Sequence, residues 1–196
     1  MQDPIVRLRA RNMPTEPTVI PSSKHTRRPD VGLHILIIIP SRKPNREDTI
    51  CAGEYLSHGG SKTVFFLHSR KDDWLDGKIF KLSTKINDEE PRVFKEIADR
   101  RLTPRILYHA RAVDEKSGKR FECWITERAI PLDDICKCEN TIKSRCSLAA
   151  FRCILQAAQY GLYLSDCGFP NFGVQLDDSA EEHTVLIIDA GSRGII

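Results

Sequence analysis

Long apolar runs are missing from this sequence of 196 residues. The longest uninterrupted run of Ile and Leu, Ile35 to Ile39, is far shorter than the roughly 20 residues that a helix needs to cross a bilayer. The N-terminus also lacks the continuous apolar core of a secretory signal. We therefore expect no membrane segment, and Ile35 to Ile39 is typical of a buried strand.

Aromatic residues are also scarce, at 7% of the chain, and the basic surplus lies outside the part expected to fold. Residues 1–50 contain nine Lys and Arg against five Asp and Glu, whereas the remainder contains 21 against 22. A nucleic-acid-binding domain would need a basic stripe with aromatic side chains for stacking. We expect no nucleic-acid partner, and the sequence leaves the oligomeric state open.

Paired Cys-x-x-Cys motifs are absent although the chain has seven cysteines. Cys136 and Cys138 are too close together for the usual zinc-ligand spacing, which has two to four intervening residues. Cys123 and Cys153 lie in apolar stretches, where we expect them to pack as small hydrophobic side chains in a reducing compartment. A cytoplasmic location is expected, with the nucleus as the alternative.

Prolines are concentrated in the first 44 residues, which hold seven of the eleven. Such a segment neither sustains a helix nor buries enough apolar area to offset its ordering entropy. We expect residues 1–50 to be mostly disordered, with one strand at residues 33–39. The basic groups at residues 24–28 and 42–46 are either localisation signals or solvated charge, and solvated charge is favoured.

The most informative stretch is residues 161–174, in which Asp166 and Asn171 are five positions apart. A second carboxylate, Asp189, follows the apolar residues Ile187 and Ile188. Asp and Asn are also common in ordinary turns, so this spacing alone is a weak signal. Their oxygen atoms are nevertheless the ligands that Mg²⁺ prefers in proteins.

This order of motifs resembles a protein kinase-like domain. The resemblance implies an α+β fold with a small β-rich amino-terminal lobe containing one helix, followed by an incomplete helical carboxy-terminal lobe. It implies that Asp166 orients the acceptor hydroxyl, that Asn171 holds Mg²⁺, and that Asp189 bridges Mg²⁺ to the phosphates of ATP. The chain departs from the family pattern at Leu164-Ser165, where His-Arg is usual, and at Ala190, where Phe is usual.

Residues 56–67 match the position of the kinase glycine-rich hairpin. The resemblance places Gly59 and Gly60 beside the phosphates and Val64 against the adenine, while Ser57 and Lys62 replace the outer glycines. Glycines let backbone N–H groups approach phosphate oxygens, so these replacements should stiffen or open the loop. An ordinary β-hairpin is the alternative interpretation of the same residues.

Lys81 lies on a short alternating strand, residues 78–82, and matches the phosphate-binding lysine of the family. Its carboxylate partner should come from the next helix, for which residues 88–101 have an acidic start and an apolar stripe. Glu90 is preferred because it continues the stripe four residues before Phe94, and Glu96 is the second choice. Solvated charge is the alternative for both glutamates.

Residues 103–113 and 120–127 predict two antiparallel strands joined by a turn at residues 114–118. In the resemblance the second strand enters the hinge, where the backbone from Glu127 onward would contact adenine. Residues 144–162 are the strongest helix prediction of the chain. The apolar positions expected to face its core are Leu148, Phe151, Ile154, Leu155 and Ala158.

The resemblance covers residues 51–127 as an amino-terminal lobe and residues 128–196 as the hinge and part of a carboxy-terminal lobe. Because the chain stops soon after Asp189, we expect either a fragment or a minimal variant. The implied function is a kinase that binds ATP and Mg²⁺ and transfers the γ-phosphoryl group to a hydroxyl, with a protein Ser or Thr favoured over a small molecule. The alternative is a pseudokinase that binds nucleotide or a partner without catalysis.

Overall fold

A computed structural model of the chain describes residues 5–10, 34–41, 47–58, 62–69, 74–84, 95–136, 140–164, 166–175 and 184–189. Its contacts group the chain into two compact units, each of which has two segments of sequence. Unit 1 comprises Met1–Ile86 and Tyr108–Ile125, and unit 2 comprises Asn87–Leu107 and Thr126–Ile196. Among the described residues strands outnumber helices, which agrees with an α+β class at that coarse level.

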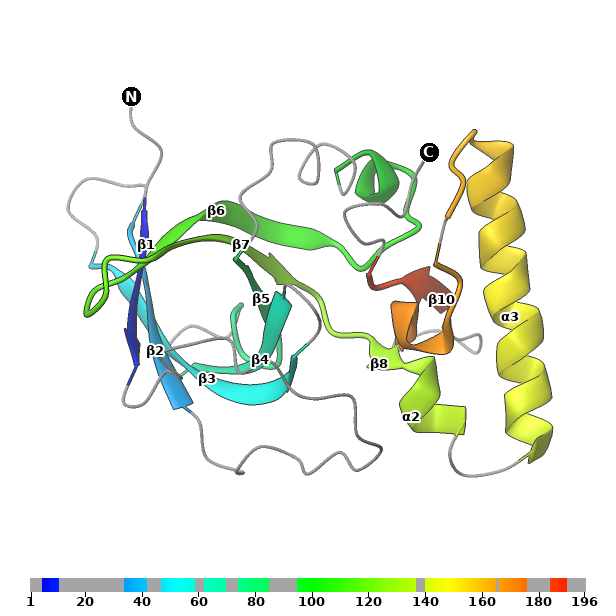
Figure 1. The fold of residues 1–196 in the computed structure, drawn as a ribbon, viewed down its shortest axis with the longest axis horizontal. Helices are drawn as coiled ribbons and strands as arrows, with labels where there is room; N and C mark the ends of the chain where they lie inside the picture. The colour runs from blue at the N-terminus through cyan, green and yellow to red at the C-terminus, as the bar shows by residue number, and fades with distance from the viewer. Residues whose placement is uncertain are drawn as a thin grey trace. The chain divides into compact units, whose positions relative to one another are not determined.

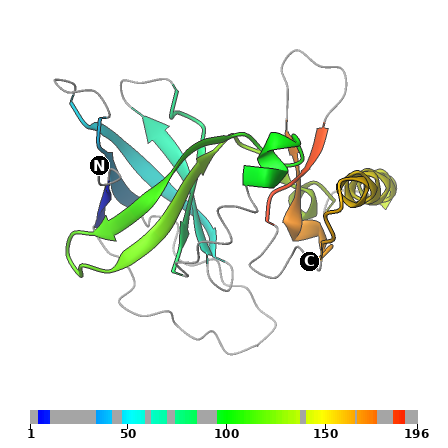
Figure 2. The ribbon, with the colours of Figure 1, turned by 90° about the horizontal axis from the view of Figure 1, so that it is seen from above.

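The described strands of unit 1 form one closed, seven-stranded barrel (Figures 1 and 2). The pairs from β1 through β5 are antiparallel, and a parallel pairing of β1 with β6 closes the barrel. In barrel order the strands are β1 (Val6–Ala10), β2 (His34–Ile39), β3 (Thr49–His58), β4 (Lys62–Ser69), β5 (Ile79–Ser83), β7 (Arg120–Thr126) and β6 (Ile106–Asp114).

Alternating side chains explain why these segments form barrel strands. In β1, Val6 and Leu8 are buried while Arg7 and Arg9 are exposed, which is the period of two expected when one face of a strand meets the core. Gly53 of β3 leaves room for this packing, because a Cβ at that position would lie 3.0 Å from Ile35 Cγ1 and 3.1 Å from Ile37 Cδ1. The interior is filled mainly by large apolar side chains, which include Ile35, Ile37, Phe65, Leu67 and Phe80.

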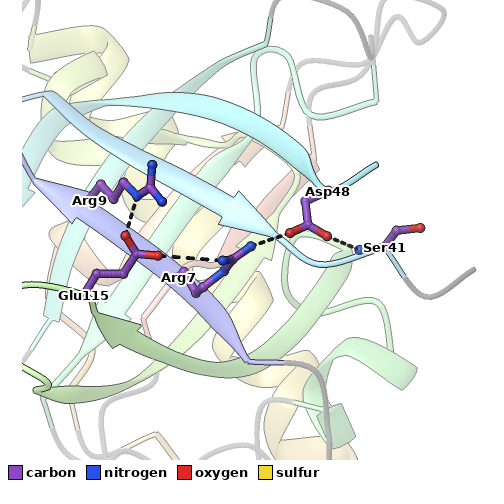
Figure 3. A network of polar contacts seen from close by, with 5 residues as sticks. All are labelled: Arg7, Arg9, Ser41, Asp48 and Glu115. Carbon is purple, nitrogen blue, oxygen red and sulfur yellow. Dashed lines mark hydrogen bonds and ion pairs between the residues drawn. The ribbon is translucent and has the colours of Figure 1, made fainter. Parts of the chain in front are cut away.

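A network of exposed charges surrounds the first strand (Figure 3). Arg7 pairs with Asp48, Arg9 pairs with Glu115, and Asp48 also accepts a hydrogen bond from the backbone N–H of Ser41 at 3.2 Å. Exposed ion pairs each contribute about 0–1 kcal/mol. Full burial of an aliphatic side chain contributes about 1.5–3 kcal/mol, so the buried inward face of β1 stabilises the barrel more than these charges do.

Strand β1 corrects one part of the sequence prediction. We expected residues 1–50 to be mostly disordered with a strand at 33–39; the structure has the strand His34–Ile39 but also the strand Val6–Ala10. The alternation in β1 is only five residues long, and its pairing partners β2 and β6 are about thirty and about a hundred residues away in sequence. Residues 11–33 and 42–46 lie outside the described part of the chain.

The barrel also differs from the lobe that the resemblance implies. The predicted hairpin after residue 103 is present as β6 and β7, and it is β-rich as expected. Strands β1 and β2 join β3 to β6 and so close the sheet on itself. The helical residues 95–99 group with unit 2, because Ile97 is buried in the core of that unit. The lobe boundaries at residues 51, 127 and 128 stay predictions.

Unit 2 combines a three-stranded antiparallel sheet with one long helix (Figure 1). Along the chain its labelled elements are β8 (Ile130–Pro131), α2 (Leu132–Cys136), α3 (Asn140–Gln159), the 3-10 turn η1 (Phe169–Asn171), β9 (Phe172–Gln175) and β10 (Thr184–Ile187), with sheet order β10-β9-β8. Their shared core consists of Ile97, Leu102, Leu132, Cys146, Ala150, Cys153, Ala157, Leu162, Phe172, Val174 and Ile187.

Helix α3 is present where the sequence predicts a helix. The largest apolar side chains that we expected to face the core are exposed instead. Leu148, Phe151 and Leu155 are about half exposed, while Ile154 is partly buried against the core. The buried positions are the small residues Cys146, Ala150, Cys153 and Ala157, at spacings of four, three and four. Within the described residues, no helix is long and apolar enough to cross a lipid bilayer.

Candidate functional site

The loop that carries Asp166 begins directly after α3. The helix ends at Gln159, and Gly161 two residues later has a φ of 75°, the left-handed conformation that glycine adopts without strain. The N–H groups of Gly161 and Leu162 then bond the carbonyls of Ala158 and Ala157, and buried Leu162 fixes the chain to the core. This helix end sets where the following loop starts.

Three hydrogen bonds shape the loop between Asp166 and Asn171. Oδ1 of Asp166 accepts the backbone N–H of Gly168 at 3.1 Å, and the carbonyl of Asp166 accepts Nδ2 of Asn171 at 3.3 Å. The N–H of Asn171 donates to the carbonyl of Gly168 at 2.9 Å within the turn η1. The carboxylate of Asp166 is therefore held at the surface by its own loop, with Oδ2 accepting no hydrogen bond among the described residues.

The same loop is joined to the end of β10 through the carbonyl of Asn171. This oxygen accepts the backbone N–H groups of Ile188 at 2.8 Å and of Asp189 at 3.3 Å. The connection follows from the hairpin register, because Phe172 is paired with Ile187 and both side chains are buried. Asp166, Asn171 and Asp189 are thus brought together within unit 2, although 23 positions separate the first from the last.

The donor atoms at this junction suit a hard divalent cation. Nδ2 of Asn171 donates to the Asp166 carbonyl, so the amide oxygen of Asn171 is left as a possible ligand, and the backbone N–H of Asp189 bonds the same asparagine. Mg²⁺ takes one or two protein oxygen ligands and completes its shell with water and phosphate oxygens. No group of three or more His, Cys, Asp or Glu able to hold a metal occurs in the described part of the chain.

Close packing of the backbone at Gly173 holds this junction in place. A Cβ on Gly173 of β9 would lie 2.8 Å from Cγ2 of Ile188, 3.1 Å from Cβ of Ala129 and 3.1 Å from the carbonyl of Ile130. Only a glycine lets β9 lie this close to Ile188 and to β8. The position of Ile188, and hence of Asp189 beside it, depends on that glycine.

Lys81 and Val64, the predicted phosphate and adenine contacts, lie in unit 1. They are directly opposite each other in the antiparallel pair of β4 and β5, so their side chains share one face of the sheet. The hairpin that precedes Val64 is closed by a 3.0 Å contact between Nδ1 of His58 and Oγ1 of Thr63. Gly59 and Gly60 lie outside the described residues, and Lys62 is buried.

The predicted glutamates have different surroundings. Glu90 lies outside the described residues, and Glu96 forms an ion pair with Arg100 at 2.8 Å on its own helical turn. The N–H of Glu127 donates to the carbonyl of Arg105 at 3.0 Å, and its carboxylate accepts Nε2 of Gln175 at 2.7 Å. The assignments of Glu90 to Lys81 and of the Glu127 backbone to adenine stay predictions.

Glu127 also lines an open pocket of about 620 Å³ within unit 2 that the sequence did not predict. Arg101 at its rim has a φ of 58°, an uncommon conformation for a residue other than glycine. The buried hydroxyl of Thr103 has no hydrogen-bond partner in the part of the chain that the structure describes. The other lining residues are Ala98, Asp99, Arg105, Ile106, Gln175, Thr184 and Leu186.

The described cysteines divide into buried and exposed thiols. Burial raises the pKa of Cys51, Cys123 and Cys153, so these side chains are thiols rather than thiolates at neutral pH. Cys167, next to Asp166, is exposed. The predicted packing of Cys123 and Cys153 as small hydrophobic side chains agrees with their burial.

No family model and no curated protein sequence matches the chain. A solved structure that resembles it is that of WaaP in complex with acyl carrier protein, at 13% sequence identity and a TM-score of 0.44. The similarity covers 70% of this chain, which spans about 60% of the length of that one. A likeness at this level does not establish a family, so the functional interpretation depends on the residues themselves.

Proposed function

We propose that the chain is a kinase-like phosphotransferase that binds ATP and moves its γ-phosphoryl group to a hydroxyl, with a protein Ser or Thr favoured over a small molecule. The observation that carries the proposal is the pair of hydrogen bonds from Ile188 and Asp189 to the carbonyl of Asn171. They bring the loop of Asp166 and the end of β10 together in the order and proximity that this chemistry needs.

Each residue then has a separate role. Asp166 is oriented through Oδ1 by the N–H of Gly168, and its Oδ2 is the atom available to accept the proton of the acceptor hydroxyl. Asn171 and Asp189 would hold Mg²⁺, which when bound neutralises charge on the phosphates. Lys81 would contact a phosphate as a point charge, beside Val64 on the same face of the barrel.

A non-catalytic nucleotide-binding or docking module is the second candidate. Two observations favour it: Ser57 and Lys62 stand where the outer glycines of the phosphate loop are expected, and the side chain of Lys62 is buried. A residue other than glycine restricts how closely the backbone approaches a phosphate. The two candidates share nucleotide binding and differ in phosphoryl transfer.

The test measures Mg²⁺-dependent ATP binding and ATP turnover on the same preparations of the full chain. Ligand binding raises the melting temperature by mass action, so ATP with Mg²⁺ should stabilise the wild type. Asp189→Ala should abolish the Mg²⁺-dependent part of that shift. Asp166→Ala should retain the shift but lose turnover by about 10²–10⁴-fold, the usual contribution of a catalytic base. Asp134→Ala, which removes an exposed carboxylate of α2, is the matched control and should change neither quantity.

The outcomes separate the candidates. Binding with turnover that depends on Asp166 supports the phosphotransferase. Binding that depends on Asp189 without turnover supports the non-catalytic module. Full turnover by Asp166→Ala would show that the catalytic loop is wrongly assigned, and an unchanged melting temperature with Mg²⁺ and ATP would contradict both proposals.

A further inference from the structure

Helix α3 has two apolar faces, one with small buried side chains and one with large exposed side chains. The face toward the core of unit 2 carries the small residues Cys146, Ala150, Cys153 and Ala157. On the other side Leu148, Phe151 and Leu155 are 52%, 54% and 48% exposed. In Figure 1 the labelled strands and helix of unit 2 lie on one side of α3, and no labelled element of that unit lies on the other. A helix usually turns its largest apolar side chains toward the core, so this arrangement needs an explanation.

The three exposed side chains form one continuous stripe. Their spacing of three and then four residues keeps them on one side of the helix, spread over about 10 Å of its length. Single exposed apolar residues are normal on protein surfaces, but large ones gathered along one helix face are typical of an interaction site. A groove-binding or pairing helix is the partner shape that such a stripe fits.

Charge around the stripe specifies the partner further. The twenty residues of α3 include no Asp or Glu, and Arg145 and Arg152 lie within about 60° of Leu148 around the helix axis. Both arginines are exposed, and neither has a carboxylate partner among the described residues. A partner with acidic side chains beside its apolar stripe would therefore pair with them, whereas a basic one would be repelled.

The same charges argue against a second copy of this chain as the occupant. In a symmetric contact the same patch meets itself. Two α3 helices would bring Arg145 and Arg152 of each copy into one interface, and neither helix would supply a carboxylate. Like charges placed together disfavour an interface.

We propose that the outer face of α3, formed by Leu148, Phe151, Leu155, Arg145 and Arg152, is a docking surface for an amphipathic helix of a partner protein whose apolar stripe is flanked by acidic residues. This surface lies on the side of α3 away from the core, and the proposal is independent of phosphoryl transfer. Binding combines burial of the three large side chains with charge pairing that gives specificity.

The test uses two synthetic helical peptides that share one Leu stripe, spaced at three and four residues, and differ only in flanks of Glu or Lys. Affinity for the full chain is measured by fluorescence anisotropy at low and high salt. The Glu peptide should bind at least about ten-fold more tightly than the Lys peptide, with a difference that shrinks in salt. Leu148→Ser with Phe151→Ser should weaken binding of the Glu peptide at least about ten-fold. Ile50→Ser, which alters an equally exposed side chain of unit 1, is the control and should leave it unchanged.

A charge exchange makes the test specific. Arg145→Glu with Arg152→Glu should reverse the preference, so that the Lys peptide binds more tightly, while the circular dichroism spectrum stays unchanged. Equal binding of both peptides, no binding of either up to about 1 mM, or no reversal would overturn the proposal. So would dimerisation of the wild type, seen by sedimentation and lost in Phe151→Ser, because the occupant would then be a second copy.

Discussion

The barrel of unit 1 and helix α3 of unit 2 place their large apolar side chains in opposite ways. In the barrel, Phe65 and Phe80 fill the interior, and charged residues such as Arg7 and Arg9 point outward. In α3, alanines and cysteines face the core while Phe151 and its neighbours face solvent. The comparison shows that hydrophobicity locates the inside of a strand more reliably than the inside of a helix that has two apolar faces.

Truncation of one phenylalanine in each region gives the largest expected contrast. Phe65→Ala removes a ring that is only 1% exposed and should lower the free energy of unfolding by about 3–5 kcal/mol. Phe151→Ala removes a ring that is half exposed, and Ala favours helix, so the change should stay within about 0.5 kcal/mol. Urea unfolding followed by circular dichroism measures both. Both tryptophans, Trp74 and Trp124, lie in unit 1, so tryptophan fluorescence also reports the unfolding of that unit in Phe65→Ala.

A large loss of unfolding free energy in Phe151→Ala would contradict this difference between barrel and helix. A loss of about 2 kcal/mol or more would be the size expected for a buried side chain, and it would mean that α3 turns Phe151 inward in solution. Equal losses for the two variants would remove the difference between barrel and helix.

Thiol labelling compares the same two regions through their buried cysteines. Burial raises the pKa of Cys51 and Cys123 in the barrel to about 12, and of Cys153 in α3 to about 11. The reactive form is the thiolate, whose fraction below the pKa falls about ten-fold per unit of pKa. At pH 8 iodoacetamide should therefore modify Cys51, Cys123 and Cys153 far more slowly than exposed Cys167.

The pH dependence has a defined sign. Because pH 7 to 9 lies below all three raised pKa values, each labelling rate should rise about ten-fold per pH unit over that range. Mass spectrometry of labelled peptides gives each rate separately. Labelling of Cys51 as fast as that of Cys167 would show that the barrel does not enclose Cys51.

Enlarging the small face of α3 should have an intermediate effect. Ala157 is fully buried, so Ala157→Leu should force neighbouring side chains apart and cost about 1–3 kcal/mol. Gln156→Leu introduces the same side chain at the adjacent exposed position and is the control, with a change within about 0.5 kcal/mol. Urea unfolding monitored at 222 nm compares them. If Ala157→Leu left the free energy of unfolding unchanged, the core of unit 2 would have room for a large residue on α3.

Local patterns predicted more of this chain than its long-range pairings. The hairpin of β6 and β7, the strand β2 and helix α3 follow from periodicity and turn residues that are close in sequence. The closure of the barrel does not, because it requires Val6 to pair with Ala112, a partner about a hundred residues away in sequence. The inward face of α3 was missed because small residues pack closely there, while the larger ones gave the clearer helical stripe.

The candidate site also has one part that local sequence predicts and another part that it does not. The spacing of Asp166 and Asn171 predicts a shared loop, and the register of Phe172 with Ile187 then brings Asp189 beside it. The pocket near Glu127 could not be found in this way, since its lining comes from residues 98–106, from Glu127 and from the hairpin of β9 and β10. A positive φ at Arg101 leaves no mark in the sequence.

The smallest predicted effect compares the two helix ends of unit 2. Both have the same pair of closing hydrogen bonds, but α3 has Gly161 at the left-handed position, whereas the turn after residues 95–99 has Arg101 there. Gly161→Ala should cost about 1 kcal/mol through its backbone alone, since an added Cβ would meet no atom within 4 Å. Arg101→Gly should raise the free energy of unfolding by about 0.5–1 kcal/mol. It relieves the strained φ and costs only a modest amount through the greater entropy of the unfolded chain. Urea unfolding with unchanged m-values measures both. A loss of stability in Arg101→Gly would mean that the Arg101 side chain makes contacts at the pocket rim that outweigh its strain.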